Sequence, residues 1–250
     1  ILTHAYPDAE IWDSATGEFE SIAPMLEPRD EVKGAVLSDG RFFVSGGYNV
    51  NYGLHKTAEI YDPATDTWTE ISSLVDKRAN HTVTVLQDGR VLVTGGGKED
   101  GPYLKSAEIY DSESDTWTTA SPMAISRHSH TATLLQDGRV LVVGGRGKRN
   151  NAEIFDPAAN TWTRTPDLSE PRGQHTAVLT TDGKVIVAGG MGNRSSVELY
   201  DPETDTWTVL ANMEEPRFRH VSLVLNDGSV LVAGGNGKEM ILAEVEKFSR

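Results

Sequence analysis

The sequence predicts an all-β chain built from one repeated unit of four short antiparallel strands. Two glycines follow an apolar segment five times, with the first glycine of each pair at Gly46, Gly95, Gly144, Gly189 and Gly234. The units are therefore 45 to 49 residues long. Asp-Gly and Asp-Pro turns separate the apolar segments, and no stretch has helical periodicity over three turns. Short strands joined by frequent turns explain this pattern better than helices do.

The unit at residues 130–162 shows each element in order. HTATLL predicts the first strand, and Asp-Gly in the following QDGR is typical of a β-hairpin turn. VLVVGG is apolar at nearly every position, which predicts a second strand buried on both faces. AEIFD alternates and predicts a half-buried third strand, and TWT after the turn PAAN predicts a short fourth strand. Four such strands in each repeat of this length are typical of a β-propeller blade.

The same elements recur along the chain. The third-strand pattern, Ala-Glu-apolar-aromatic-Asp or VELYD, begins at Ala9, Ala58, Ala107, Ala152 and Val197. The large aromatic residue of the fourth strand recurs at Phe19, Trp68, Trp117, Trp162 and Trp207. AEVEKF, from Ala243, is an imperfect last copy of the third strand, in which we expect the aromatic residue and the aspartate to be lost.

The Gly-Gly pair after an apolar strand, the aromatic-Asp pair, the spaced tryptophans and Met-x-x-x-Arg-x-x-His together resemble the kelch repeat. The resemblance covers residues 1–250, which we expect to form a single domain. It implies a kelch-type β-propeller with five blades of four antiparallel strands, or six blades as the alternative. Five blades follow if the strands near Ala9 and Phe19 complete the blade that begins near His220. Residues 243–248 can instead take that place, form a tail or begin a truncated sixth blade.

Composition limits the function classes. A net charge of −14 argues against nucleic acid and anionic membranes as partners. The absence of cysteine excludes disulfides, thiolate nucleophiles and cysteine metal sites. No apolar stretch approaches the roughly 18 residues that span a bilayer. We expect a monomer, and the sequence indicates no cellular compartment.

No catalytic motif is present, so we expect no catalytic residues, no metal site and no cofactor. Gly-x-Ser-x-Gly, His-Glu-x-x-His and phosphate-binding glycine loops are all missing. Four histidines share one register, at His81, His130, His175 and His220. Equivalent residues of neighbouring blades lie roughly 10 Å apart, too far to share a zinc ion with bonds of about 2.0–2.1 Å. We expect these histidines to bond loop backbone.

One arginine precedes the first strand of each unit, at Arg29, Arg78, Arg127, Arg172 and Arg217. Two interpretations stay open. The guanidiniums can form a ring at the mouth of a central channel, which suits a carboxylate or phosphate ligand. Alternatively, they can pair with the third-strand glutamates, Glu10, Glu59, Glu108, Glu153 and Glu198.

Variable loops on a rigid scaffold are the usual place for binding. The loops between second and third strands, and those that precede first strands, vary in length and content. They hold a basic group of residues, Arg146, Lys148, Arg149, Arg194, Arg219 and Lys238. The turns at the opposite end of the strands are uniform and rich in aspartate. We therefore predict a strongly negative turn end and a basic sector at the loop end.

These features favour a non-catalytic module that presents its loops to an acidic peptide or protein, or to an anionic saccharide. The candidate ligand-binding residues are Arg127, Arg172, Arg217, Arg219, Arg146, Arg194, Tyr48, Tyr52, His128 and Phe218. One alternative is a sugar-modifying enzyme resembling kelch-type sialic acid epimerases. Another is a purely structural or engineered repeat scaffold, because the middle units are very similar to one another.

Overall fold

The computed structural model describes residues 7–97, 101–147 and 149–248. Every regular element in these ranges is a short β-strand, which confirms the all-β prediction. The described residues include no helix that is long and apolar enough to cross a membrane. The chain divides into two compact units, residues 1–120 and 121–250, and each is described by itself.

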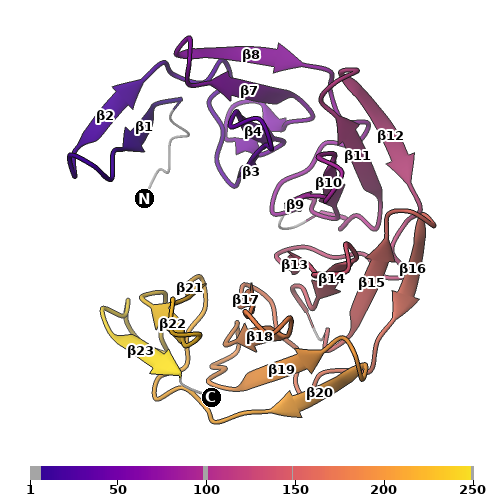
Figure 1. The fold of residues 1–250 in the computed structure, drawn as a ribbon, viewed down its shortest axis with the longest axis vertical. Helices are drawn as coiled ribbons and strands as arrows, with labels where there is room; N and C mark the ends of the chain where they lie inside the picture. The colour runs from indigo at the N-terminus through magenta and orange to yellow at the C-terminus, as the bar shows by residue number, and fades with distance from the viewer. Residues whose placement is uncertain (1–6, 98–100, 148, 249–250) are drawn as a thin grey trace. The chain divides into compact units, whose positions relative to one another are not determined.

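The first unit contains two four-stranded antiparallel sheets in the predicted strand order (Figure 1). One consists of β3 (Lys33–Val36), β4 (Phe42–Ser45), β7 (Ala58–Asp62) and β8 (Thr67–Ile71). The other consists of β9 (Thr82–Val85), β10 (Val91–Thr94), β11 (Ala107–Asp111) and β12 (Thr116–Ala120). Two smaller pairs are β1 (Ala9–Trp12) with β2 (Phe19–Ile22), and β5 (Tyr48–Asn49) with β6 (Gly53–Leu54).

The second unit contains two further complete sheets and one with three strands. The complete sheets are β13 (Thr131–Leu134), β14 (Val140–Val143), β15 (Ala152–Asp156) and β16 (Thr161–Arg164), then β17 (Thr176–Leu179), β18 (Val185–Ala188), β19 (Val197–Asp201) and β20 (Thr206–Val209). The last sheet consists of β21 (Val221–Val224), β22 (Val230–Ala233) and β23 (Val245–Phe248). Five sheets of the chain therefore begin with a first-strand to second-strand hairpin, as the repeats predict.

The last sheet corrects two expectations. β23 pairs with β22, so the chain near Ala243, and not the strand near Ala9, supplies its third strand. Val245 lies opposite Ala233 as Val197 lies opposite Ala188. VEKF is thus equivalent to VELY, and Phe248 occupies the aromatic position that we expected to be lost. From the sequence we had aligned Ala243 and Glu244 with the Ala-Glu that begins the other third strands. In the structure these two residues precede the strand, which begins at Val245.

The core lies between neighbouring sheets. In the second unit, Leu141 and Val143 of β14 belong to one apolar cluster with Val185 and Val187 of β18, and all four side chains are fully buried. This explains why second strands are apolar at nearly every position: both of their faces meet protein. Complete burial of such a side chain contributes about 1.5–3 kcal/mol.

The tryptophan of each fourth strand bonds to the end of the preceding fourth strand. Trp117 Nε1 donates to the carbonyl oxygen of Ser72, which follows β8, over 2.7 Å. Its ring packs 5.1 Å from that of Tyr110 and 6.1 Å from that of Phe43. Equivalent bonds join Trp68 to Ala23, Trp162 to Ser121 and Trp207 to Pro166. These bonds hold each tryptophan against the chain that follows the preceding fourth strand.

We expect Trp117→Ala to lower the free energy of unfolding by about 2–3 kcal/mol, because a half-buried ring and a hydrogen bond are lost together. Urea unfolding followed by circular dichroism measures the change. Trp12→Ala is the matched control, since Trp12 is 55% exposed. Equal losses in the two variants would contradict the assigned role.

Candidate functional site

The arginines that precede the first strands are buried, and each is bonded to a third-strand glutamate. Arg172 shows the pattern: its Nη2 donates to Glu198 Oε1 over 2.6 Å. Its Nη1 donates to the carbonyl oxygens of Gly189 and Ser196, over 2.9 and 3.1 Å. Both charged side chains are almost fully buried, and burial lowers the pKa of Arg172. One guanidinium therefore joins the loop to the ends of two strands.

The glutamate of each pair also holds the loop backbone. Glu198 Oε2 accepts the backbone N–H of Ser169 over 2.9 Å. The five pairs are Arg29–Glu59, Arg78–Glu108, Arg127–Glu153, Arg172–Glu198 and Arg217–Glu246. The pairing interpretation is confirmed, with one change: Glu246 belongs to the set and Glu10 does not. Sequence reasoning missed Glu246 because it misaligned AEVEKF.

Burial removes four residues from the candidate ligand-binding set. The side chains of Arg127, Arg172 and Arg217 have no exposed surface. His128 is 1% exposed, and its Nδ1 lies 3.0 Å from Ser129 Oγ. A ligand in solvent cannot reach these donors, so their role is to hold the loops in place.

The histidines in register also bond between neighbouring sheets. Nε2 of His220 lies 2.9 Å from Thr176 Oγ1, and Nε2 of His175 lies 2.9 Å from Thr131 Oγ1. These ring partners are side-chain hydroxyls, and His220 also bonds the backbone of Ala188, at the end of β18. Among the described residues, no three His, Asp or Glu side chains are placed to hold a metal ion. These histidines therefore have a structural role.

The glycine pairs bring neighbouring repeats close together. Gly144 has a φ of 64°, and a Cβ there would lie 2.2 Å from the carbonyl oxygen of Arg172. The N–H of Gly145 donates to that same oxygen over 2.9 Å. A side chain at Gly144 would separate the two loops, so glycine is required at this position.

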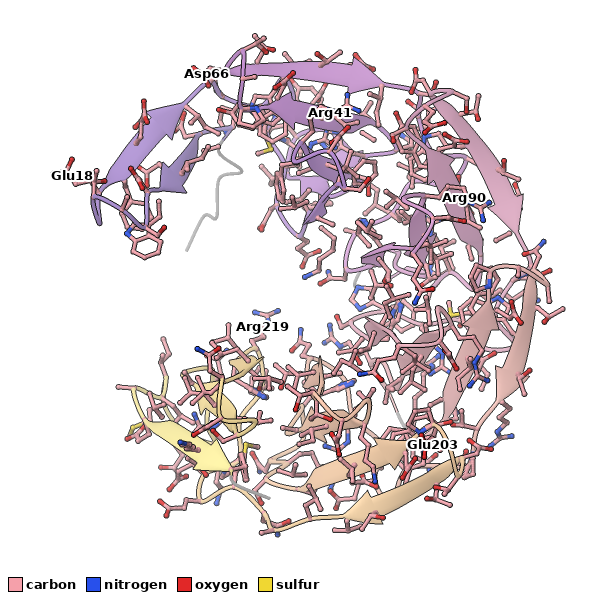
Figure 2. All side chains as sticks on the ribbon, in the orientation of Figure 1. Glu18, Arg41, Asp66, Arg90, Glu203 and Arg219 are labelled. Carbon is pink, nitrogen blue, oxygen red and sulfur yellow. The ribbon has the colours of Figure 1, made fainter. Side chains whose placement is uncertain are left out.

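The turn end is less negative than its aspartates predict. In the first turn of three of the sheets an arginine pairs with the aspartate two residues before it, as Arg139 does with Asp137 over 2.7 Å. Arg41 and Arg90, labelled in Figure 2, make the same pair with Asp39 and Asp88. The other turn is structural: Asp66 Oδ1 accepts the hydroxyl of Tyr61 over 3.0 Å. Its aspartates recur because they hold the turn.

A hollow of about 340 Å³ lies at the loop end of the second unit. Arg146, Pro171, Met191 and Arg194 are among its lining residues. The structure thus brings together two arginines that the sequence placed on separate loops. Arg194 Nη1 lies 3.0 Å from Glu170 Oε1, and both side chains stay partly exposed. Lys148, also predicted in this basic sector, lies outside the described residues.

One variable position per repeat has a left-handed backbone. Its φ lies between 51° and 54° at Glu31, Asn80, Ser129, Gln174 and Arg219. This conformation costs a non-glycine residue about 1–3 kcal/mol, yet no repeat has glycine there. The position follows the buried arginine by two residues, and its side chain is polar and different every time. The sequence analysis named only Arg219 from this set. The other four positions could have been found in the same way, because each is a variable residue between the repeated arginine and the first strand.

Arg219 is the exposed cation of this set (Figure 2). Its N–H donates to the carbonyl oxygen of Gln174 over 2.9 Å. The amide oxygen of Gln174, in the orientation that satisfies both groups, lies 3.1 and 3.2 Å from Nε and Nη2 of Arg219. Gln174 follows Gly173, which lines the hollow. Phe218 is half-buried and exchanges backbone hydrogen bonds with Asn236 over 3.0 and 2.8 Å.

Tyr48 and Tyr52 belong to the β5–β6 hairpin of the first unit. Tyr48 is half-buried and exchanges two backbone hydrogen bonds of 2.7 Å with Asp30. Tyr52, at the turn of the hairpin, is 75% exposed. It lines a hollow of about 570 Å³ together with other residues, including His55, Lys56 and Lys77. This is a second concave surface at a loop end, and it combines an aromatic ring with two cations.

Comparison with known proteins agrees with the strand order. The family model of the KLHDC2/KLHL20/DRC7 Kelch-repeats domain matches residues 33–235. A solved structure titled "Structure of YjhT" is similar with a TM-score of 0.77 at 18% sequence identity, over 96% of this chain and 87% of that chain. No curated protein matches. Together with the sheet topology, these matches confirm the predicted kelch-type β-propeller class.

We expect Glu198→Gln to lower the free energy of unfolding by about 3–5 kcal/mol, because it leaves the buried Arg172 charge without its counterion. Urea unfolding measures the loss. Asp137→Asn is the control, since the exposed Asp137–Arg139 pair contributes only about 0–1 kcal/mol. A loss at Glu198 no larger than the control would show that the buried pair does not stabilise the fold.

Stability should also fall in mild acid. Burial, and then the Arg217 guanidinium, lower the pKa of His220 from 6.5 to about 4. A lowered pKa contributes stability that is complete above pH 6.5 and is lost as the pH falls toward 4. We expect this loss to be about 2–3 kcal/mol. His220→Asn should flatten the dependence of unfolding free energy on pH in this window, and identical slopes for the two proteins would refute the assignment.

Proposed function

Because the chain belongs to the kelch-repeat family, we propose that it is a binding module whose loops recognise an acidic peptide or protein segment. The observation that carries the proposal is the exposed guanidinium of Arg219. It extends from a strained, variable position and bonds Gln174, which follows Gly173 in the lining of the hollow that Arg146 and Arg194 share. Strained residues persist where the surrounding structure and a functional demand both hold them.

The chemistry of this surface favours an anionic partner. A guanidinium presents a planar fork of donors that fits a carboxylate. Arg194 already holds one carboxylate, that of Glu170, at the rim of the hollow. A ligand carboxylate can exchange with Glu170 or bind beside it on Arg219. Pro171 and Met191 supply apolar surface between the cations. An acidic peptide segment with apolar side chains fits this combination of cations and apolar surface better than a small acidic saccharide does.

The distribution of charge also favours the loop end of the sheets as the binding surface. At the turn end, guanidiniums such as that of Arg139 are paired within their own turns. At the loop end of the second unit, the exposed side chain of Arg219 bonds to the neutral amide of Gln174 and not to a carboxylate among the described residues. The sugar-modifying enzyme and the purely structural scaffold remain predictions from the sequence.

Binding of a fluorescein-labelled octaglutamate peptide tests the proposal by anisotropy at low salt. We expect Arg219→Ala and Arg194→Ala each to weaken binding by about 10-fold, the lower end of the range for a lost charged hydrogen bond. The control is Arg139→Ala, at the turn end. Octaglutamine should not bind, and raising the salt should weaken octaglutamate binding.

Two results would overturn the proposal. One is unchanged affinity in both loop-end variants when circular dichroism shows that they are folded. The other is an equal loss in Arg139→Ala, which would indicate attraction by overall charge. Tighter binding of a sulfated oligosaccharide than of any acidic peptide, lost in the same variants, would keep the surface but replace the ligand class.

A further inference from the structure

The hollow of about 570 Å³ beside Tyr52 belongs entirely to the first unit. Its nine lining residues come from the loop before β3, from the β5–β6 hairpin with the segment that follows it, and from the loop before β9. We propose that it binds a small organic anion with a planar, nitrogen-bearing ring, as in a nucleoside monophosphate. Tyr52 packs on the ring, and Lys56 and Lys77 hold the anionic group. The inference does not depend on the proposed function, which concerns the second unit.

The two lysines of the hollow are exposed and unpaired. Lys56 follows β6 and Lys77 precedes β9, so they lie on different loops that line the same hollow. Neither side chain makes an ion pair with any residue that the structure describes. Lys184 and Lys247, by contrast, lie 2.8 and 2.7 Å from aspartate oxygens. In a protein with a net charge of −14, two unpaired ammoniums that line one hollow make a local site for phosphate or carboxylate oxygens.

The hairpin presents Tyr52 as a fixed aromatic surface. Tyr52 is 75% exposed, although its backbone N–H donates to the carbonyl oxygen of Asn49 over 3.3 Å. Asn49 is buried, and its Nδ2 donates to the carbonyl oxygen of Pro28 over 3.0 Å, which ties the hairpin to the loop before β3. The half-buried Leu54 also lines the hollow. An exposed ring on a tied hairpin, with an apolar side chain in the same lining, makes a stacking surface for a planar ring.

His55 forms a buried polar part of the wall. It is 8% exposed, and backbone hydrogen bonds to Gly47 and Arg78 hold it in place. Its Nδ1 lies 3.7 Å from Glu27 Oε2, and its Nε2 has no hydrogen-bond partner among the described residues. Burial, and then the Arg29 guanidinium, lower the pKa of His55, so the imidazole is neutral near pH 7.

A neutral His55 indicates which ring the hollow accepts. Because Nδ1 faces a carboxylate, it carries the proton, and Nε2 is left as an acceptor. An N–H of a ligand ring satisfies this acceptor after a small rotation of the imidazole, and a ring without such a donor leaves it unpaired. Glu27 favours the same orientation, since its carboxylate accepts donors and repels the anionic group toward Lys56 and Lys77.

Isothermal titration calorimetry with adenosine monophosphate at low salt tests the proposal. We expect saturable binding, and at least about 10-fold weaker binding of adenosine, which lacks the phosphate, and of ribose 5-phosphate, which lacks the ring. Indole-3-acetate combines a ring N–H with a carboxylate. Saturable binding of either anion supports the proposal, and the tighter of the two identifies the anionic group as phosphate or carboxylate.

Variants of the protein locate the ligand. Lys77→Ala and Tyr52→Ala should each weaken binding by about 10-fold, whereas Tyr52→Phe, which keeps the ring, should not. Lys105→Ala is the control for charge, because Lys105 has the position of Lys56 in the next repeat and is exposed outside the hollow.

The proposal is refuted if neither anion binds saturably, or if adenosine and ribose 5-phosphate bind as tightly as the nucleotide. It is also refuted if the Lys77→Ala and Tyr52→Ala variants, shown to be folded by circular dichroism, bind like the unmodified protein. An equal loss in Lys105→Ala would indicate attraction by overall charge, and would overturn the assignment of the hollow.

Discussion

The buried pair between an arginine and a third-strand glutamate is the interaction on which the loop ends of the sheets depend. Taking two such charges out of water costs several kcal/mol for each ion. The cost is offset because the Arg172 guanidinium also bonds two carbonyl oxygens, and Glu198 also accepts a backbone N–H. Each pair thus fixes a long loop against its own sheet without using any exposed side chain. The loop surface is left free to vary.

This division explains the arrangement of repeated and variable residues. The arginine and, in four units, the histidine recur because each bonds to fixed partners. The residue two positions after each of these arginines has a strained backbone in every unit, but its side chain differs from unit to unit. A position that is rigid in backbone and variable in side chain is suited to recognition. Arg219 and Gln174 are the clearest examples in the second unit.

The sheets also depend on their neighbours. Second strands are buried only because another sheet covers them, as Val185 and Val187 show against β14. Stability in such repeat proteins comes largely from contacts between adjacent units.

The sequence by itself determined the strand type, the strand order within each repeat and the turns, because these depend on local periodicity and on residues such as Asp-Gly. It also indicated that the repeated arginines and the third-strand glutamates, which are equal in number, could form ion pairs. Only the tertiary structure decided that Arg172 is buried and Arg219 exposed, since both are arginines next to the same strand type. It likewise decided that VEKF pairs with β22, because register depends on contacts between segments distant in sequence. Exposure and pairing are properties of packing, and residue type alone does not specify them.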